Sequence, residues 1–242
     1  MYAIETIDLT KKYKDVVAVS GLNLQIKPGE LYSLLGVNGA GKTTAIRMLS
    51  CIVKPTSGDA LLNGRSVIRE SSEVKKIIAV SPQETAIAPG LSVRENLELI
   101  CGVHGYSEEK TRQKIVELSD AMGLSEISGK RAGKLSGGLK RRLSIAMALI
   151  SEPKILFLDE PTLGLDVLAR AELWDLIKSL RGRVTTLLTT HYMEEAEALS
   201  DRVGIMKDGA LLISATVGEI KEKAGCERFE EAFIRIIKEA GK

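Results

Sequence analysis

The spacing of apolar residues changes along the chain, and the change predicts a strand-rich start, a helical middle and a mixed end. Before residue 92 the apolar runs are short and are bounded by turn residues, which is typical of strands. The strand runs are 3–9, 16–19, 22–26, 31–35, 59–62 and 77–80, with one helix-like run at 43–51. Because Ser20-Gly21 and Pro28-Gly29 break the earliest runs, we expect an antiparallel β lobe there.

From residue 92 to about residue 151 a helical period replaces the strand pattern. Apolar residues recur at helical spacing in three groups, namely Val93, Leu97, Ile100 and Val103, then Ile115, Leu118, Ala121 and Met122, then Leu143, Ala146, Met147 and Ile150. This stretch predicts an α-helical insert.

Strand runs return after the insert. The expected elements are strands at 154–158 and 184–189, helices at 166–180 and 194–199, and a hairpin of 203–206 with 210–213. The tail is helical and carries apolar residues on one face, which we expect to pack on the body or on a partner: Phe229, Ala232, Phe233, Ile236, Ile237 and Ala240.

This order of elements predicts one α/β domain over residues 1–242. Residues 1–91 and 152–216 are expected to form a mixed α/β core with the β lobe. Residues 92–151 form a helical subdomain, and residues 217–242 form a C-terminal helical tail.

Positive and negative charges nearly balance, with 34 basic and 32 acidic residues and a net charge of +2. No wide electrostatic field therefore recruits nucleic acid, and we expect no nucleic-acid partner. The three cysteines are scattered, which argues against a zinc site or a secreted disulfide framework and favours a reducing cytosol. The N-terminus does not resemble a signal peptide, and no run approaches the roughly 18 apolar residues of a membrane span. We expect a soluble chain.

Residues 36–44 match the phosphate-binding pattern G-x-x-x-x-G-K-[ST], between an apolar run and a helix-like run. The glycines let the backbone wrap closely around a di- or triphosphate, so that N–H groups and the helix start face the anion. Lys42 is expected to reach the β- and γ-phosphates, and the Thr43 hydroxyl to ligate Mg²⁺. The candidate nucleotide-binding residues of the loop are Gly36, Asn38, Gly39, Ala40, Gly41, Lys42, Thr43 and Thr44.

Two later strand runs end in residues that can act on a phosphate. Asp159 ends the first and is the candidate Mg²⁺ partner, whereas Glu160 is placed to orient and partly deprotonate the hydrolytic water. His191 follows the second and is expected to contact the γ-phosphate and the Glu160 region. Acids at strand ends and lone histidines are often structural, so these assignments depend on the phosphate loop.

Gln83 and Tyr13 are weaker candidates. Gln83 leaves a strand, where a polar residue is common, but its amide could reach Mg²⁺ or the attacking water. Tyr13 is expected in the first connection, where packing is the ordinary role of an exposed tyrosine. With a nucleotide site downstream, stacking of its ring on a purine is favoured.

A second glycine-bearing helix start lies at residues 135–142. Ser136 is a good N-cap, and Gly137 and Gly138 expose backbone N–H groups at the positive helix end. The alternative is an ordinary capped helix with a basic flank. Because the first loop already supplies a nucleotide cradle, the second helix start suggests a nucleotide held between two copies of the chain.

Almost end to end, the chain resembles the nucleotide-binding subunit of ATP-binding cassette (ABC) transporters. The matching residues are the aromatic Tyr13, the Walker A loop at 36–44, Gln83 of the Q-loop, the signature LSGG at 135–138, the Walker B run at 155–160, Leu165-Asp166 of the D-loop and His191 of the switch. The resemblance implies ATP and Mg²⁺ as cofactors and a head-to-tail dimer. Each ATP then lies between the Walker A loop of one subunit and the signature of the other, so that Ser136, Gly137, Gly138 and Asp166 join the site. The resemblance also implies that hydrolysis reopens the dimer and that the helical insert passes this motion to separate membrane-spanning permease subunits.

Departures from the family pattern are modest. Leu139 stands where the family often has Gln, and Val37 and Val167 stand where Pro is frequent; none removes a phosphate-contacting group. Residues 190–197 and 229–237 resemble the branch that serves drug, antibiotic and polysaccharide exporters. We therefore expect a homodimeric ATPase that powers an exporter and is attached peripherally, through its permease, to the cytoplasmic face of the cell membrane.

Two other classes share part of the pattern. A soluble ABC-type ATPase acting on ribosomes or DNA typically carries two cassettes or a long coiled coil, whereas this chain has one cassette and no sustained heptads at 52–134. A phosphoryl-transferring kinase or small GTPase leaves the LSGG run unexplained, and no N-K-x-D motif follows the phosphate loop.

Overall fold

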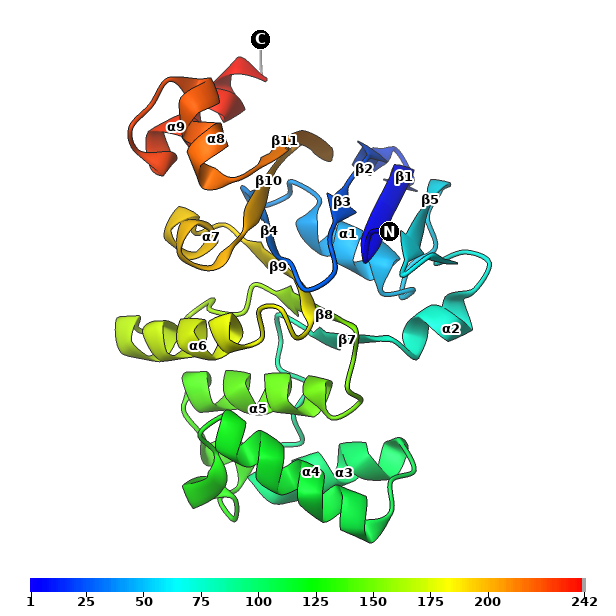
Figure 1. Ribbon diagram of the computed structural model, residues 1–242, viewed down its shortest axis with the longest axis vertical. Coiled ribbons are helices and arrows are strands. Elements are labelled where there is room, and N and C mark those ends of the chain that lie inside the picture. The colour runs from blue at the N-terminus through cyan, green and yellow to red at the C-terminus, as the bar shows by residue number, and fades with distance from the viewer. Residues whose placement is uncertain (241–242) are drawn as a thin grey trace.

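Two β-sheets organise the computed structural model, which describes residues 1–240 (Figure 1). The first sheet holds β1 (Ile4–Tyr13), β2 (Val16–Leu22), β3 (Gln25–Ile26), β5 (Ser57–Leu62) and β6 (Arg65–Ser66). Its order is β2-β1-β5-β6, with β3 paired to β1, and all pairs are antiparallel. The antiparallel β lobe is thereby confirmed.

Strand β1 is longer than the apolar alternation predicts. β2 pairs with it as far as Tyr13 opposite Val16, across two register shifts. Lys14 adopts a φ of 49° in the tight turn between the strands. Backbone pairing thus continues beyond the last buried side chain, Leu9. The expectation that Tyr13 lies in a connection was wrong, because it is the last residue of the strand.

The second sheet has the order β11-β10-β4-β9-β8-β7. Its strands are β4 (Leu31–Gly36), β7 (Ile78–Ser81), β8 (Ile155–Asp159), β9 (Thr185–Thr190), β10 (Arg202–Lys207) and β11 (Ala210–Ala215). All neighbours are parallel except the edge strand β11. Every residue of β4, β8 and β9 is buried, as expected for parallel strands covered on both faces. Their carboxyl ends meet at one edge, which brings together Gly36, Asp159 and Thr190.

Helices cover this sheet and extend beyond it. They are α1 (Lys42–Leu49), α2 (Ser71–Lys75), α3 (Val93–Val103), α4 (Glu108–Ala121), α5 (Gly137–Leu149), α6 (Val167–Ser179), α7 (Met193–Leu199), α8 (Val217–Ala224) and α9 (Phe229–Glu239), with 3₁₀ turns at Ser125–Ile127 and Ala132–Lys134. Figure 1 shows α3, α4 and α5 grouped at one end, with α5 nearest the sheet, and α8 and α9 at the other end. The short helix α2 was not predicted, because Val74 is its only buried residue and leaves no periodic pattern.

The core divides into three apolar clusters. One joins the β lobe and α1 to one side of the parallel sheet, and includes Ile4, Tyr32 and Met48. A second joins the other side to the helices α3 to α6, and includes Leu97 and Leu143 from the predicted helical stretch. The residues that repeat at helical spacing are therefore largely the ones that pack inward.

The third cluster packs the C-terminal helices against α7 and β10. Phe229, Ala232 and Phe233 are buried there, Ile236 and Ile237 are half-buried, and Ala240 is exposed. The predicted apolar face thus packs on the body of the same chain through its first two turns. The last two residues of the predicted tail, 241–242, lie outside the described residues.

Within residues 1–240, none of the helices combines the length and the apolar content that crossing a membrane requires.

Candidate functional site

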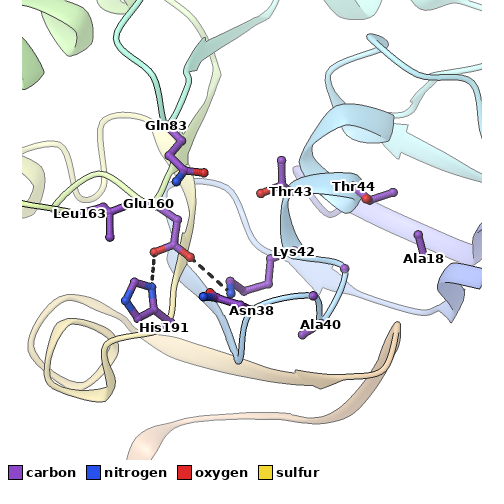
Figure 2. Close-up of a pocket in the computed structure, with 12 residues that line it drawn as sticks. Ala18, Asn38, Ala40, Lys42, Thr43, Thr44, Gln83, Glu160, Leu163 and His191 are labelled. Atoms are coloured by element: carbon purple, nitrogen blue, oxygen red, sulfur yellow. Dashed lines mark hydrogen bonds and ion pairs between the residues drawn. The ribbon is translucent and has the colours of Figure 1, made fainter.

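A cavity of about 450 Å³ opens at the carboxyl edge of the parallel sheet. Its lining consists of Ala18, Asn38, Gly39, Ala40, Gly41, Lys42, Thr43, Thr44, Gln83, Glu160, Leu163 and His191. The structure therefore brings the loop after β4 together with residues that follow β7, β8 and β9 (Figure 2). Because these strands are parallel neighbours, residues far apart in the sequence arrive at one place.

The loop between β4 and α1 forms an anion cradle. Gly41 precedes α1 with a φ of 100°, and no side chain caps this helix, so its first N–H groups remain directed at the cavity. A Cβ atom on Gly41 would lie 2.3 Å from the carbonyl oxygen of Ala18, and one on Gly36 would lie 2.5 Å from that of Met206. Close backbone contacts leave no room for a side chain at either position, so both must be glycine. The positive φ of Gly41 is a second reason for glycine there.

Lys42 is buried at the centre of this cradle. Its Nζ donates to the carbonyl oxygens of Gly36 at 2.7 Å and Val37 at 3.3 Å, and lies 3.3 Å from Glu160 Oε1. A buried ammonium needs such partners, because water cannot solvate it there. A phosphate group entering the cradle would offer the same ammonium a stronger, charged acceptor.

Glu160 links Lys42 to His191. Its other carboxylate oxygen, Oε2, lies 2.7 Å from His191 Nδ1 (Figure 2). The residue adopts a φ of 48°, which is uncommon for a non-glycine residue, and its N–H donates to Thr189 Oγ1 at 3.0 Å. The backbone turn directly after β8 therefore aims the carboxylate into the cavity instead of along the strand.

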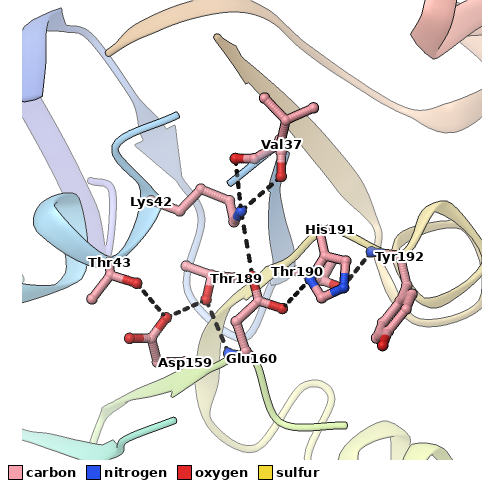
Figure 3. Close-up of polar contacts among 10 residues, drawn as sticks. Val37, Lys42, Thr43, Asp159, Glu160, Thr189, Thr190, His191 and Tyr192 are labelled. Atoms are coloured by element: carbon pink, nitrogen blue, oxygen red, sulfur yellow. Dashed lines mark hydrogen bonds and ion pairs between the residues drawn. The ribbon is translucent and has the colours of Figure 1, made fainter. Parts of the chain in front are cut away.

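Asp159 and Thr43 form a second polar group behind Lys42 (Figure 3). Asp159 Oδ1 accepts hydrogen bonds from Thr43 Oγ1 at 3.1 Å and from Thr189 Oγ1 at 2.5 Å. Asp159 is only 5% exposed, so its carboxylate is shielded from solvent and lies behind Thr43 of the cavity lining. One carboxylate with a neighbouring hydroxyl suits Mg²⁺, which is usually held by one or two protein oxygens together with substrate phosphates. No cluster of three or more His, Cys, Asp or Glu side chains with metal-binding geometry occurs in residues 1–240.

Comparison with known proteins identifies the family. Residues 19–163 match the family model described as ABC transporter. The chain belongs to the ABC transporter family. It is 41% identical over 224 residues to the "Daunorubicin/doxorubicin resistance ATP-binding protein DrrA" of Streptomyces peucetius, an overlap that covers 92% of this chain and 68% of that protein.

Two solved ABC structures resemble the whole fold. CbiO1 from Clostridium perfringens, part of the ABC transporter complex CbiONQ, superposes with a TM-score of 0.82 at 26% identity and covers 93% of this chain and 96% of that chain. The ATP-binding cassette MJ0796, solved as a dimer in a post-hydrolysis state with ADP and Pi, gives a TM-score of 0.78 at 29% identity over 88% of this chain and 98% of that chain.

The predicted ABC ATPase fold is therefore confirmed, and so is the predicted function class. The chain is an ATP-binding and ATP-hydrolysing subunit that powers a membrane transporter. The alternative of a soluble ABC-type ATPase acting on ribosomes or DNA is not favoured.

Seven of the predicted site residues do not line the cavity that the described residues form. They are Tyr13, Gly36, Ser136, Gly137, Gly138, Asp159 and Asp166. Gly36 and Asp159 lie directly behind the lining, through their contacts with Lys42 and Thr43. Tyr13 is 42% exposed on the β lobe, and Lys11 Nζ lies 5.0 Å from its ring centroid.

The ABC signature residues instead begin α5. Ser136 caps this helix by accepting a hydrogen bond from the Leu139 N–H at 3.4 Å, as predicted. Gly137 is exposed, but Gly138 is buried against α6. A Cβ atom on Gly138 would lie 3.0 Å from Ala169 Cβ of α6, so the two helices are in close contact there. The expectation that both glycines expose their backbone was therefore incomplete: Gly138 also allows α5 to pack closely on α6. Asp166 caps α6 by accepting from the Ala169 N–H at 2.9 Å.

Sequence reasoning missed three residues of the ABC site. Ala18 and Leu163 line the cavity, and Thr189 joins Asp159 to the Glu160 backbone. A small residue in a strand and an apolar residue in a loop carry no chemical signal. Thr189 could have been found, because two threonines end a buried strand immediately before His191.

Proposed function

We propose that this chain is the MgATP-hydrolysing subunit of an exporter and that its residues divide the work between phosphate binding and water activation. The observation that carries the assignment is the continuous contact from Lys42 through Glu160 to His191, at 3.3 and 2.7 Å, at the mouth of the phosphate loop. A buried base held between a cation and a histidine is what attack of water on a phosphate requires.

Lys42 has two alternative sets of acceptors. In the structure it donates to the Gly36 and Val37 carbonyl oxygens and pairs with Glu160. When ATP occupies the loop, Lys42 turns to the β- and γ-phosphates, and the N–H groups at Asn38 to Thr44 bind the phosphate oxygens. Loss of the Lys42 contact frees one oxygen of Glu160 to accept a hydrogen bond from the attacking water.

Glu160 then orients this water and accepts its proton as the water oxygen bonds to the γ-phosphorus and the bond to the β-phosphate oxygen breaks. His191 keeps the carboxylate in place through Nδ1 and, as a residue of the cavity lining, would contact the γ-phosphate. Gln83 reaches into the same cavity from the end of β7, on the side opposite the loop (Figure 2). These three side chains and Lys42 form the proposed catalytic set.

Thr43 and Asp159 are the proposed Mg²⁺-binding residues, with Gln83 completing the set. The Thr43 hydroxyl, which lines the cavity, donates to Asp159 Oδ1 at 3.1 Å, so the two oxygens are close enough to bind the same ion. When bound, Mg²⁺ neutralises phosphate charge and holds the reacting group in line.

We further propose that the site is completed by a second copy of this chain. Ser136 and Gly137 are exposed at the start of α5, and Asp166 is exposed at the start of α6. In a head-to-tail dimer these residues, with Gly138, would meet the γ-phosphate held by the partner, while the Tyr13 ring stacks on adenine. A homodimer needs no further chain to supply both halves.

Export is supported by the relative named for daunorubicin and doxorubicin resistance, because removal of a toxic compound from the cell would produce resistance. The chain then lies peripherally on the cytoplasmic face of the cell membrane, attached through separate permease subunits. To couple ATP hydrolysis to the permease, we propose that residues 92–151 move as one helical subdomain relative to the core of 1–91 and 152–216. Residues 217–242 form an appended tail.

A dilution experiment tests the shared site. The purified chain is assayed for phosphate release from MgATP across a wide range of protein concentration, with its mass measured in parallel by sedimentation. The rate per chain should fall on dilution as the dimers separate, and should vanish when EDTA removes Mg²⁺. A monomer that hydrolyses ATP at the full rate would contradict the proposal.

A further inference from the structure

The loop after β7 is attached at both ends to the helices of the signature side. At its far end the buried Asn96 of α3 accepts from the Ala88 N–H at 2.8 Å and donates to the Ala88 carbonyl oxygen at 3.1 Å. At its near end Ser81 Oγ lies 2.9 Å from Ser144 Oγ of α5. Glu84 and Ala86 between these points are exposed.

The strongest attachment is made by Arg141 of α5. Its Nη1 donates to the Pro82 carbonyl oxygen at 2.6 Å, and its Nη2 donates to the Gln83 carbonyl oxygen at 2.7 Å. The planar guanidinium therefore holds two successive peptide groups with two parallel donors, a geometry that lysine cannot reproduce. The backbone of Gln83, whose side chain lines the ATP cavity, is fixed from a helix that does not line it.

This arginine is buried at 5% exposure, which is unusual for its residue type. Burial lowers the pKa of the Arg141 guanidinium, while the negative charges of Asp159 and Glu195 oppose that shift. Arg142 points to a different side of α5 and pairs with Glu172 of α6.

We infer that Arg141 is a positioning residue for ATP hydrolysis, which ties Gln83 to the signature helix α5. The inference rests on the proposed role of Gln83 in the cavity. Ser136, the N-cap of α5, stands five residues before Arg141, which is about 7.5 Å along the helix axis. When the start of α5 meets the partner's ATP, any displacement of the helix is passed directly to the Gln83 of the same chain. Arg141 thereby links the two ATP sites of a dimer through one rigid helix.

The test compares Arg141→Gln with Arg142→Gln in the full chain. Arg141→Gln removes the paired donors and should lower kcat by about 10- to 100-fold, the effect of misplacing a reacting group by about 1 Å. The KM for ATP should stay within about twofold, because the phosphate loop is untouched. Arg142→Gln loses only a partly exposed ion pair and should keep kcat within about twofold. Equal kcat values for the two variants would overturn the inference.

A double-mutant cycle separates positioning of Gln83 from general damage to the fold. If Arg141 acts through Gln83, then Arg141→Gln should cost less than about twofold in kcat once Gln83→Ala is present. Independent, multiplying effects of the two substitutions would contradict the inference. If Arg141→Gln fails to fold, Arg141→Lys takes its place, because it keeps the charge but not the paired donors, and kcat should then fall about threefold or more.

Hydrogen exchange distinguishes failure of this inference from failure of the role proposed for Gln83. Amides of residues 83–87 should exchange faster in Arg141→Gln than in the wild type, and at the wild-type rate in Arg142→Gln. If Gln83→Ala leaves hydrolysis unchanged while this exchange still rises, the role of Gln83 is wrong and the attachment by Arg141 stands. If the exchange does not change, the attachment itself is refuted.

Discussion

Two helix starts of this chain offer backbone N–H groups to an anion, and they differ in what surrounds them. The start of α1 follows Gly41 without a side-chain cap and sits in a cavity together with Lys42 and Glu160. The start of α5 is capped by Ser136, is exposed, and does not line that cavity within the described residues. The same kind of helix dipole therefore faces a cavity in one place and an exposed surface in the other.

The contrast supports the proposal that a second copy of the chain completes the site. The first helix start is supported by parallel strands that deliver a lysine, two carboxylates and a histidine to one edge. The second packs on α6 through Gly138 and does not join the cavity lining formed by the described residues. In the proposed dimer it would therefore meet a phosphate held by the other chain.

The largest expected effect comes from the base at the first helix start. Glu160→Gln keeps the shape of the side chain but removes the charge that accepts a proton, so kcat should fall by about 10²- to 10⁴-fold. ATP binding and MgATP-dependent dimers should persist, because Lys42 and the loop remain. Phosphate release and sedimentation with MgATP measure the two effects. Glu109→Gln, at an exposed glutamate of α4, is the control. Loss of ATP binding in Glu160→Gln would show that Glu160 belongs to the cradle.

Removing the cation of the first helix start should weaken binding itself. Lys42→Ala deletes charged hydrogen bonds to the phosphates, so the Kd for ATP should rise by about 10- to 100-fold. Titration with a fluorescent ATP analogue measures it, with Lys178→Ala on the exposed face of α6 as the matched control. An unchanged Kd with a reduced kcat would instead make Lys42 a purely catalytic residue and would weaken the comparison.

A mixture of variants tests whether the second helix start acts on the partner. Lys42→Ala and Ser136→Ala should each be nearly inactive alone. Mixed dimers combine the intact loop of one chain with the intact signature of the other, so the mixture should recover about a quarter of the wild-type rate, since half of random dimers are mixed and each keeps one site of two. Loss of the cap should also cost about 1 kcal/mol of stability, measured by urea unfolding. No recovery despite demonstrated mixed dimers would refute the sharing.

The smallest expected effect lies in the packing behind the first site, at Glu195 of α7. Burial raises the pKa of Glu195, and hydrogen bonds including the one from Trp174 Nε1 at 3.2 Å oppose the rise. A raised pKa in the folded state means that the folded chain binds the proton more tightly than the unfolded chain. The stability from this proton is full below the ordinary value of 4.5 and is lost as the pH rises through the folded value.

Glu195→Gln should therefore flatten the fall in the free energy of unfolding as the pH rises above 4.5, because the amide is neutral throughout. Urea unfolding at a series of pH values measures this, and Glu197→Gln on the exposed side of α7 should keep the wild-type slope. Parallel curves for Glu195→Gln and the wild type would show that Glu195 does not titrate in this range.

Local signals explain what could be predicted. The phosphate loop was found because its glycines, lysine and threonine are contiguous and lie between a strand and a helix. Asp159, Glu160 and His191 were found because each stands at or just after the end of a buried strand. The extension of β1 to Tyr13 was missed because backbone pairing with β2 sustains it, and no side-chain pattern records that pairing.

The sequence by itself determined the parts of this protein that depend on neighbouring residues: the conformation of the phosphate loop, the cap at Ser136 and the periodic faces of the helices. Only the tertiary structure decided which of these parts meet. The contact of Glu160 with both Lys42 and His191, and the hold of Arg141 on Gln83, join residues from separate elements. Such contacts depend on strand order and helix packing, and these are settled by burial over the whole chain and not by any single stretch of it.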